Sequence, residues 1–326
     1  MSKLDNYREL IESRLSEVPS KSSPQGLYDP IKYILSLGGK RIRPVLCLSA
    51  TALFDETKIE ESIPAALALE TFHNFTLLHD DIMDNSPLRR NKPTVHEKWN
   101  NNSAILSGDA MLIEAYKLVA KIPEKLLSKS IKLFNQTAVE VCEGQQYDME
   151  FEDRNDVTID EYLEMIKLKT AVLIGTSLKM GAIIGGANEE NAQYIYDYGI
   201  NLGISFQLKD DWLDVFGNEE DFGKPIGQDI VNNKKTFLLL YALNHLRDKD
   251  RIELLEWISK EEFNNSEKIN SVIDLYSKVD VSKETQILME SYYTKSIDAL
   301  NKIENINPDI KDELINFSQN LMFRNR

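Results

Sequence analysis

The sequence predicts an all-α protein, organised as one large helical bundle that takes up residues 1–326. Apolar residues recur at intervals of three and four along almost the whole chain, and the alternating segments typical of strands are nearly absent. The chain contains only 14 Gly and 10 Pro, so long helices can form, and 42% of its residues are hydrophobic, enough for a packed core. No linker rich in Pro, Gly or Ser divides the chain, which is why we expect a single domain.

The positions of the expected helices follow from this periodicity and from helix start signals. Thr158 and Glu161 form a capping box that opens one helix, and Pro64 lies near the start of another. Before Lys235 we expect helices at residues 63–84, 103–121, 126–152, 158–186 and 191–215. From Lys235 onwards the pattern predicts four or five more, with breaks near residues 249, 263, 280 and 307.

Composition and charge exclude several classes of function. The formal net charge of −15 and the pI of about 4.9 argue against nucleic acid as a partner, because such a partner requires a basic face. Cys47 and Cys142 lack metal-binding spacing and fit a reducing compartment. The N-terminus is amphipathic and contains acids, unlike a signal peptide, and no stretch of 18 apolar residues is free of charge. We therefore expect a cytoplasmic protein without a membrane span.

One short acidic motif, Asp-Asp-x-x-Asp, occurs twice, at residues 80–84 and 210–214. Positions i and i+4 of a helix lie on one face, so the first and last carboxylates of each motif can point at one place. Carboxylates so close repel one another unless a cation lies between them, and Mg²⁺ prefers such oxygen ligands together with substrate phosphates. A single copy would fit an exposed acidic helix end, but two copies in apolar helices predict two magnesium sites. The longest gaps between the expected helices, residues 85–102 and 217–233, directly follow the motifs and suit mobile lids.

A basic loop at residues 38–44, with the sequence GGKRIRP, is the second informative element. Its glycines allow backbone amides to approach an oxyanion closely, and Pro44 suits the first turn of a following helix. Lys40, Arg41 and Arg43 are thus expected just before a helix N-terminus, a favourable place for phosphate. The alternative is a basic surface turn.

Further basic residues follow or accompany the acidic motifs. Arg89 and Arg90 come shortly after the first motif, and Lys224 and Lys234 come after the second. Lys169 lies in an otherwise apolar helix, where an unpaired ammonium group would be costly. Arginine pairs with phosphate through two parallel hydrogen bonds. Together these residues suggest a site for two polyphosphate groups.

These motifs resemble those of the trans-prenyl diphosphate synthases, the polyprenyl synthetase family that makes farnesyl, geranylgeranyl and longer diphosphates. The resemblance covers roughly residues 30–240 and rests on GGKRIRP at 38–44, FHNFTLLHDDIMDNSPLRRNKPTVH at 72–96, KT at 169–170, FQLKDDWLDVFG at 206–217 and GKPIGQDIVNNKKT at 223–236. It implies an isoprenoid synthase-like bundle around a central apolar cavity, and a homodimer. Asn91 stands where the family often has Gly, and Asn also tolerates a left-handed turn.

The resemblance also implies roles for individual residues. The direct ligands of about three Mg²⁺ ions would be Asp80, Asp84 and Asp210, with Asp81 and Asp214 in support. The allylic diphosphate would be bound by Arg89, Lys169 and Lys224. Isopentenyl diphosphate would be bound by Lys40, Arg43, His73 and Arg90. The nascent carbocation would face the neutral oxygens of Thr170 and Gln207, while Lys234 closes the pocket.

The implied reaction begins with Mg²⁺-dependent ionisation of dimethylallyl, geranyl or farnesyl diphosphate. The allylic cation then meets the double bond of isopentenyl diphosphate, and loss of a proton gives a chain longer by five carbons. One alternative is a class I terpene cyclase, for which residues 38–44 would be superfluous. The others are a non-catalytic synthase subunit, which would typically lack one acidic motif, and a scaffold that binds divalent ions.

Two phenylalanines precede the first acidic motif. Phe75 lies five residues before Asp80, roughly 7.5 Å along a helix axis, and Phe72 is its i, i+3 neighbour. Both rings fit ordinary core packing, but the resemblance implies that the fifth position before this motif sets product length. We therefore expect geranylgeranyl diphosphate as the main product, with farnesyl diphosphate as the alternative.

Overall fold

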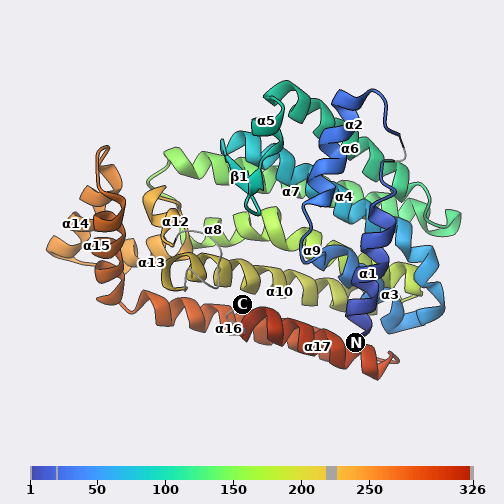
Figure 1. Ribbon diagram of the computed structural model, residues 1–326. Helices are drawn as coiled ribbons and strands as arrows, with labels where there is room; N and C mark the ends of the chain where they lie inside the picture. The colour runs from blue at the N-terminus through green and yellow to red at the C-terminus, as the bar shows by residue number, and fades with distance from the viewer. Residues whose placement is uncertain (1, 20, 218–225, 324–326) are drawn as a thin grey trace. The chain divides into compact units, whose positions relative to one another are not determined.

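The computed structural model describes residues 2–19, 21–217 and 226–323, and this part of the chain is almost entirely helical (Figure 1). The only sheet among the described residues is an antiparallel hairpin of β1 (Leu88–Arg89) and β2 (Lys92–Pro93). The all-α prediction is therefore confirmed. Lys224, to which we assigned a diphosphate, lies outside the described residues.

The backbone contacts group the chain into two compact units, each described by itself. The first unit consists of residues 1–136, 176–196 and 303–314. Its complete helices are α1 (Lys3–Leu15), α2 (Gln25–Ser36), α3 (Ile42–Asp55), the 3₁₀ turn η1 (Glu56–Lys58), α4 (Ile59–Met83), α5 (Val95–Lys98) and α6 (Asn101–Val119). Helix α4 packs against both α3 and α6 and buries residues on most of its surface, so it forms the centre of this unit.

The second unit consists of residues 137–175, 197–302 and 315–326. Its complete helical elements are α8 (Ile159–Ile166), the π-helical segment η2 (Lys167–Ala171), α12 (Gln228–Val231), α13 (Phe237–His245), α14 (Asp248–Ser259), α15 (Asn265–Ser277) and α16 (Val281–Asn301). Helices α12 to α15 share one apolar core, in which Leu238 and Leu254 are fully buried. Figure 1 shows α14 and α15 lying side by side in this unit.

Four long helices contribute residues to both units: α7 (Glu124–Asp153), α9 (Val172–Gly185), α10 (Glu189–Phe216) and α17 (Pro308–Phe323). Nothing in the grouping tests the expectation of one domain over residues 1–326, which stays a prediction.

Most predicted helices are found within two or three residues of their expected ends, including the breaks after residue 235. The helix predicted at residues 63–84 begins earlier, at Ile59, because Glu60 and Glu61 favour a first turn there. The capping box of Thr158 and Glu161 is present, with the Thr158 hydroxyl accepting from the Glu161 amide at 3.2 Å. The helix predicted over residues 158–186 is instead interrupted by the π-helical segment η2.

By length and composition, the helical stretch Ile159–Gly185 alone among the described residues would be able to cross a membrane. In the structure, 83% of its most apolar window is buried inside the protein. Such burial is the ordinary property of a core helix, so this stretch is weak support for a membrane span.

Candidate active site

The first acidic motif occupies the C-terminal end of α4. The helix ends at Met83, and the Asp84 amide donates to the Asp80 carbonyl at 2.9 Å, so these two residues are one turn apart on one face. Asp81 is buried, whereas Asp84 is exposed. Carboxylates at a helix C-terminus face the negative end of the helix dipole, which is unfavourable without a cation. The arrangement therefore fits the predicted magnesium site.

Arg89 follows this motif in the chain and binds the carboxylate of its second acid, Asp81. The Arg89 Nε donates to both oxygens of Asp81, at 2.9 and 2.8 Å, and Nη2 lies 2.7 Å from Asp81 Oδ1. The same Nη2 is 3.8 Å from an oxygen of Asp80. Burial raises the pKa of Asp81 although Arg89 opposes this shift. Asp81 is thus bound by a side chain of the protein, and its supporting role at a metal site stays a prediction.

The hairpin after the motif brings Arg90 to the basic loop. Its two-residue turn consists of Arg90 and Asn91, both with positive φ (52° and 59°), as a type I′ turn requires. Arg90 Nη1 donates to the carbonyl of Gly38. At Gly39, with φ of 133°, a Cβ would lie 2.8 Å from the Arg90 guanidinium group, so only glycine fits. The structure therefore joins two motifs that are about fifty residues apart in sequence.

Arg43 and His73 form the inner part of the same basic cluster. Arg43 Nη1 lies 3.0 Å from His73 Nε2, and because a guanidinium group can only donate, Nε2 accepts and the imidazole proton is on Nδ1. Burial, reinforced by the neighbouring Arg43, lowers the pKa of His73 well below its usual value, which keeps the ring neutral. Arg43 Nε is buried without a hydrogen-bond partner among the described residues, whereas Lys40 is exposed. Unsatisfied donors of this kind suit a phosphate oxygen.

Arg41 corrects one expectation, since it does not belong to the phosphate-binding surface. Its backbone is left-handed, and its side chain is buried. It donates to Glu12 and Glu70, each at 2.8 Å, and to the Leu35 carbonyl at 2.7 Å. Arg41 therefore anchors the loop to α1 and α4. The sequence analysis did not predict its partner Glu70, although an acid within the apolar helix at residues 63–84 indicates a buried ion pair.

The second acidic motif lies at the C-terminal end of α10, in the second unit. The buried Asp211 accepts from the Tyr162 hydroxyl at 2.6 Å and from Gln207 Nε2 at 2.9 Å. Asp214 Oδ2 accepts from the Asp229 amide at 3.0 Å. Burial, followed by the Asp229 carboxylate, raises the pKa of Asp211 above its usual range and that of Asp214 to about 6. This accumulation of carboxylates also calls for a cation.

The π-helical segment η2 positions the Lys169–Thr170 pair. Lys169 Nζ donates to Asp148 Oδ2 at 2.6 Å, and Thr170 Oγ1 donates to Gln207 Oε1 at 3.2 Å. A Cβ on Gly144 would lie 2.3 Å from the Lys169 backbone nitrogen, so this glycine allows α7 to approach the segment closely. π-helical turns are frequent at functional sites, because the extra residue redirects side chains.

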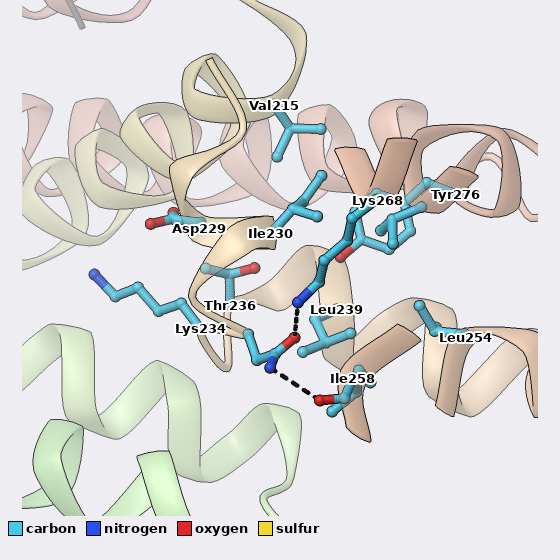
Figure 2. A pocket seen from close by; sticks show the side chains of 12 residues that line it. Val215, Asp229, Ile230, Lys234, Thr236, Leu239, Leu254, Ile258, Lys268 and Tyr276 are labelled. Atoms are coloured by element: carbon cyan, nitrogen blue, oxygen red, sulfur yellow. Dashed lines mark hydrogen bonds between the residues drawn. The ribbon is translucent and has the colours of Figure 1, made fainter. Parts of the chain in front are cut away.

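Two acids of the second unit, Asp148 and Asp229, were missed by the sequence reasoning. Asp148 is one of several acids on an amphipathic helix and carried no motif signal. Asp229 belongs to residues 223–236, one of the segments that resemble the family, so the sequence offered a signal for it. The Lys234 amide donates to the Asp229 carbonyl at 2.9 Å, and both side chains line one small cavity (Figure 2).

The predicted site residues thus form two clusters, one in each unit. The first-unit cluster contains Lys40, Arg43, His73, Asp80, Asp84, Arg89 and Arg90. The second-unit cluster contains Lys169, Thr170, Gln207, Asp210 and Lys234. Among the residues that the structure describes, no three His, Cys, Asp or Glu side chains gather into a metal site by themselves. The individual assignments stay predictions.

The two phenylalanines before the first motif belong to a row of aromatic rings. Phe72 is buried and lies 5.6 Å from Phe75 and 5.3 Å from Phe134, measured between ring centroids. The row extends from Phe134 to Tyr116 at 5.1 Å, and from Phe75 to His79 at 4.8 Å. The two rings are therefore neighbours, as the i, i+3 spacing predicted.

Comparison with known proteins places the chain in a family. The profile of the polyprenyl synthetase family matches residues 24–276. The geranylgeranyl diphosphate synthase of Sulfolobus acidocaldarius is 35% identical over 334 residues, covering 100% of both chains. The short chain isoprenyl diphosphate synthase of Methanocaldococcus jannaschii is 40% identical over 258 residues, covering 79% of this chain and 78% of its own.

Solved structures agree with the sequence comparison. A geranylgeranyl pyrophosphate synthase has a TM-score of 0.94 at 46% identity, covering 99% of both chains. The geranylgeranyl pyrophosphate synthetase from Pyrococcus horikoshii has a TM-score of 0.91 at 34% identity, covering 99% of this chain and 97% of its own. The chain therefore belongs to the polyprenyl synthetase family and is a prenyltransferase.

Proposed function

We propose that the enzyme condenses isopentenyl diphosphate with an allylic diphosphate and makes geranylgeranyl diphosphate as its main product. The observation that carries this proposal is the first-unit cluster, where a carboxylate motif with Arg89 adjoins the basic group of Arg43, His73 and Arg90. Two anion-binding groups of different character suit two diphosphates. Several relatives named geranylgeranyl diphosphate synthase support a twenty-carbon product, with farnesyl diphosphate as the alternative.

The acidic motifs would hold the metal. Prenyl diphosphate synthases generally use Mg²⁺, and here Asp80, Asp84 and Asp210 would bind about three ions. Bound Mg²⁺ would neutralise the charge that collects on the departing diphosphate. Arg89, Lys169 and Lys224 would bind the departing diphosphate; Arg89 donates to Asp81, and Lys169 donates to Asp148.

The basic loop would bind isopentenyl diphosphate. Lys40 and Arg90 are exposed and would approach the phosphates from solvent, while Arg43 offers its buried Nε. The neutral His73 ring donates through Nδ1, because its Nε2 accepts from Arg43. Binding the second substrate separately from the leaving group would hold its double bond ready for attack.

Thr170 and Gln207 would face the allylic cation. Their side-chain oxygens lie 3.2 Å apart, and neutral oxygens stabilise positive charge without the reactivity of a carboxylate. Lys234, whose amide donates to the Asp229 carbonyl, would close the pocket. The aromatic row from Tyr116 to His79 would exclude water from the growing chain, with Phe72 and Phe75 limiting its length.

We further propose a cytoplasmic homodimer built from one catalytic domain per chain. Helix α6 exposes Ile105, Leu106 and Ile113, whose exposed fractions are 45%, 59% and 60%. Apolar side chains gathered on one exposed helix are typical of an interface, and a second copy would cover them. Both cysteines are free, as a reducing compartment requires.

The test is an assay of the purified protein with Mg²⁺, isopentenyl diphosphate and an allylic primer. Diphosphate release that needs both substrates is expected, and chromatography of the dephosphorylated alcohols should show mainly a twenty-carbon chain. Release from the allylic diphosphate alone would indicate a terpene cyclase. Absence of release would indicate a scaffold or a non-catalytic subunit.

A further inference from the structure

Helix α15 contains a buried lysine, Lys268, that belongs to none of the sequence motifs. The residue, Lys268, is 1% exposed, although an ammonium group inside a protein is costly without partners. Its Nζ donates to Asn233 Oδ1 at 2.8 Å, a bond drawn as a dashed line in Figure 2. It also donates to the Val231 carbonyl at 3.2 Å and lies 4.1 Å from the centroid of the Phe263 ring. These partners are neutral, so the lysine fixes backbone and amide groups and does not serve a salt bridge with them.

Both polar atoms of the Asn233 side-chain amide form hydrogen bonds. While the Asn233 oxygen accepts from Lys268, its Nδ2 donates to the Ile258 carbonyl of α14 at 3.0 Å. The backbone of Asn233 is left-handed, with φ of 53°, which Asn tolerates better than most residues. Helices α14 and α15 together therefore clamp the turn that follows the single-turn helix α12.

The clamped turn connects two groups of the proposed active site. Val231 and Asn233 lie between Asp229 and Lys234 in the chain, and the Lys234 amide donates to the Asp229 carbonyl at 2.9 Å. The Asp229 amide in turn donates to Asp214 of the second acidic motif at 3.0 Å. A displacement of the turn would therefore move both Asp229 and Lys234 relative to the second motif.

The space around the turn leaves it little freedom. Asp229, Lys234 and Lys268 line one cavity of about 10 Å³, room for about one water molecule (Figure 2). A helix of one turn has little stability of its own, so its position depends on what packs against it. Lys268 supplies two hydrogen bonds to the turn, and the Ile258 carbonyl accepts a third from it.

We propose that Lys268 is a positioning residue for the allylic-diphosphate side of the reaction, acting through Asn233 and Val231 on Asp229 and Lys234. This inference rests on the proposed prenyl transfer. Helices α14 and α15, which contain none of the motifs, would then help to position residues of the active site. A lysine that served only the core would affect stability and leave the kinetic parameters of the folded enzyme unchanged.

The experiment compares steady-state kinetics of the wild type and Lys268→Met, whose side chain keeps the volume but loses the donor. The KM for the allylic diphosphate and the half-saturating Mg²⁺ concentration should rise about tenfold, the size expected for a lost hydrogen bond to a charged group. The KM for isopentenyl diphosphate should stay within about twofold, because its binding residues lie elsewhere. Equal changes for both substrates, or none, would overturn the inference.

Two further variants make the test specific. Lys278→Met, at the end of the same helix, removes a half-exposed ion pair with Asp250 (2.8 Å) and should leave all parameters within about twofold. Asn233→Gly keeps the left-handed backbone accessible while removing the side-chain amide, and should reproduce the loss. The double variant of Lys268 and Asn233 should lose little more than either single one, since both act through one contact. A fully additive loss would contradict this route, and Asn233→Gly decides the question if Lys268→Met does not fold.

Hydrogen exchange separates failure of this inference from failure of the proposed function. Amides of residues 227–236 should exchange faster in Lys268→Met than in the wild type or Lys278→Met, and this measurement needs no turnover. A wild type without prenyl transfer would overturn the proposed function. Unchanged exchange in an active enzyme would overturn the positioning role alone.

Discussion

The two acidic motifs share one sequence pattern and one location, the C-terminal end of a long helix, yet they have different neighbours. In the first motif the central carboxylate, Asp81, is bound by the charged Arg89. In the second, the corresponding Asp211 is bound by the neutral Tyr162 and Gln207. In each motif the second acid is thus bound by a side chain of the protein, a charged one in the first motif and neutral ones in the second.

The two motifs therefore also differ in the charge of the residues next to them. Arg89 offsets part of the negative charge of the first motif, whereas Asp229 adds a further carboxylate to the second. Burial and Asp229 both raise the pKa of Asp214 to about 6, which records the unfavourable environment for its charge. We therefore expect the second motif, which Lys234 offsets only in part, to depend more on added Mg²⁺ than the first, which is paired with Arg89.

The largest expected effect comes from removing the first acid of either motif. Asp80→Ala and Asp210→Ala should each lower kcat by at least about 10²-fold, equivalent to about 2.7 kcal/mol, because each removes a proposed metal ligand. Turnover measured across a range of Mg²⁺ concentrations checks this. If both variants kept near-normal turnover at saturating Mg²⁺, these carboxylates would not be the catalytic ligands, and the two motifs would be alike only in sequence.

A second prediction separates the two anion-binding groups of the first unit. Lys40→Ala and Arg43→Ala should raise the KM for isopentenyl diphosphate about tenfold while changing that for the allylic diphosphate much less. Arg89→Ala should show the opposite preference, since Arg89 pairs with two carboxylates of the acidic motif. Steady-state kinetics with each substrate varied in turn provides the measurement. Equal effects on both substrates would mean that the basic loop and the motif form one undivided site.

The third prediction concerns a feature that only the first motif possesses. Five residues before Asp80 is the aromatic Phe75, whereas the same position before Asp210 is the small, buried Ser205. Phe75→Ala should lengthen the product by about one five-carbon unit, and further with Phe72→Ala, because the aromatic row is then opened.

Chromatography of the dephosphorylated products tests this prediction. Tyr116→Phe is the matched control, because it keeps a ring at the far end of the row and loses only a hydrogen bond to Asn135 (2.9 Å). Its product should be unchanged. An unaltered length distribution in the double variant of Phe72 and Phe75 would mean that the rings serve only as core packing.

The comparison also explains what the sequence was able to predict. Helices were predictable because their apolar periodicity is carried by many residues, and the motif carboxylates because i, i+4 spacing needs only local geometry. The π-helical turn at Lys167–Ala171 was not, because one extra residue barely alters an almost wholly apolar pattern. Asp148 and the anchoring of Arg41 also depend on contacts between distant segments, which no local pattern encodes.

The smallest expected effect tests the difference between charged and neutral support of the central acids. Arg89→Met leaves the buried Asp81 without its cation and should lower the free energy of unfolding by about 2 kcal/mol, since a buried charge loses its partner. Tyr162→Phe removes one neutral donor from Asp211, which keeps its bond from Gln207, and should cost about 1 kcal/mol. Urea unfolding without Mg²⁺ measures both values. If Tyr162→Phe lost more unfolding free energy than Arg89→Met, the neutral donors would stabilise the second motif at least as strongly as Arg89 stabilises the first. In that case the burial of Asp211 and the nearby Asp229 carboxylate would be the reason, because both disfavour the charge of Asp211 and make each remaining donor more important.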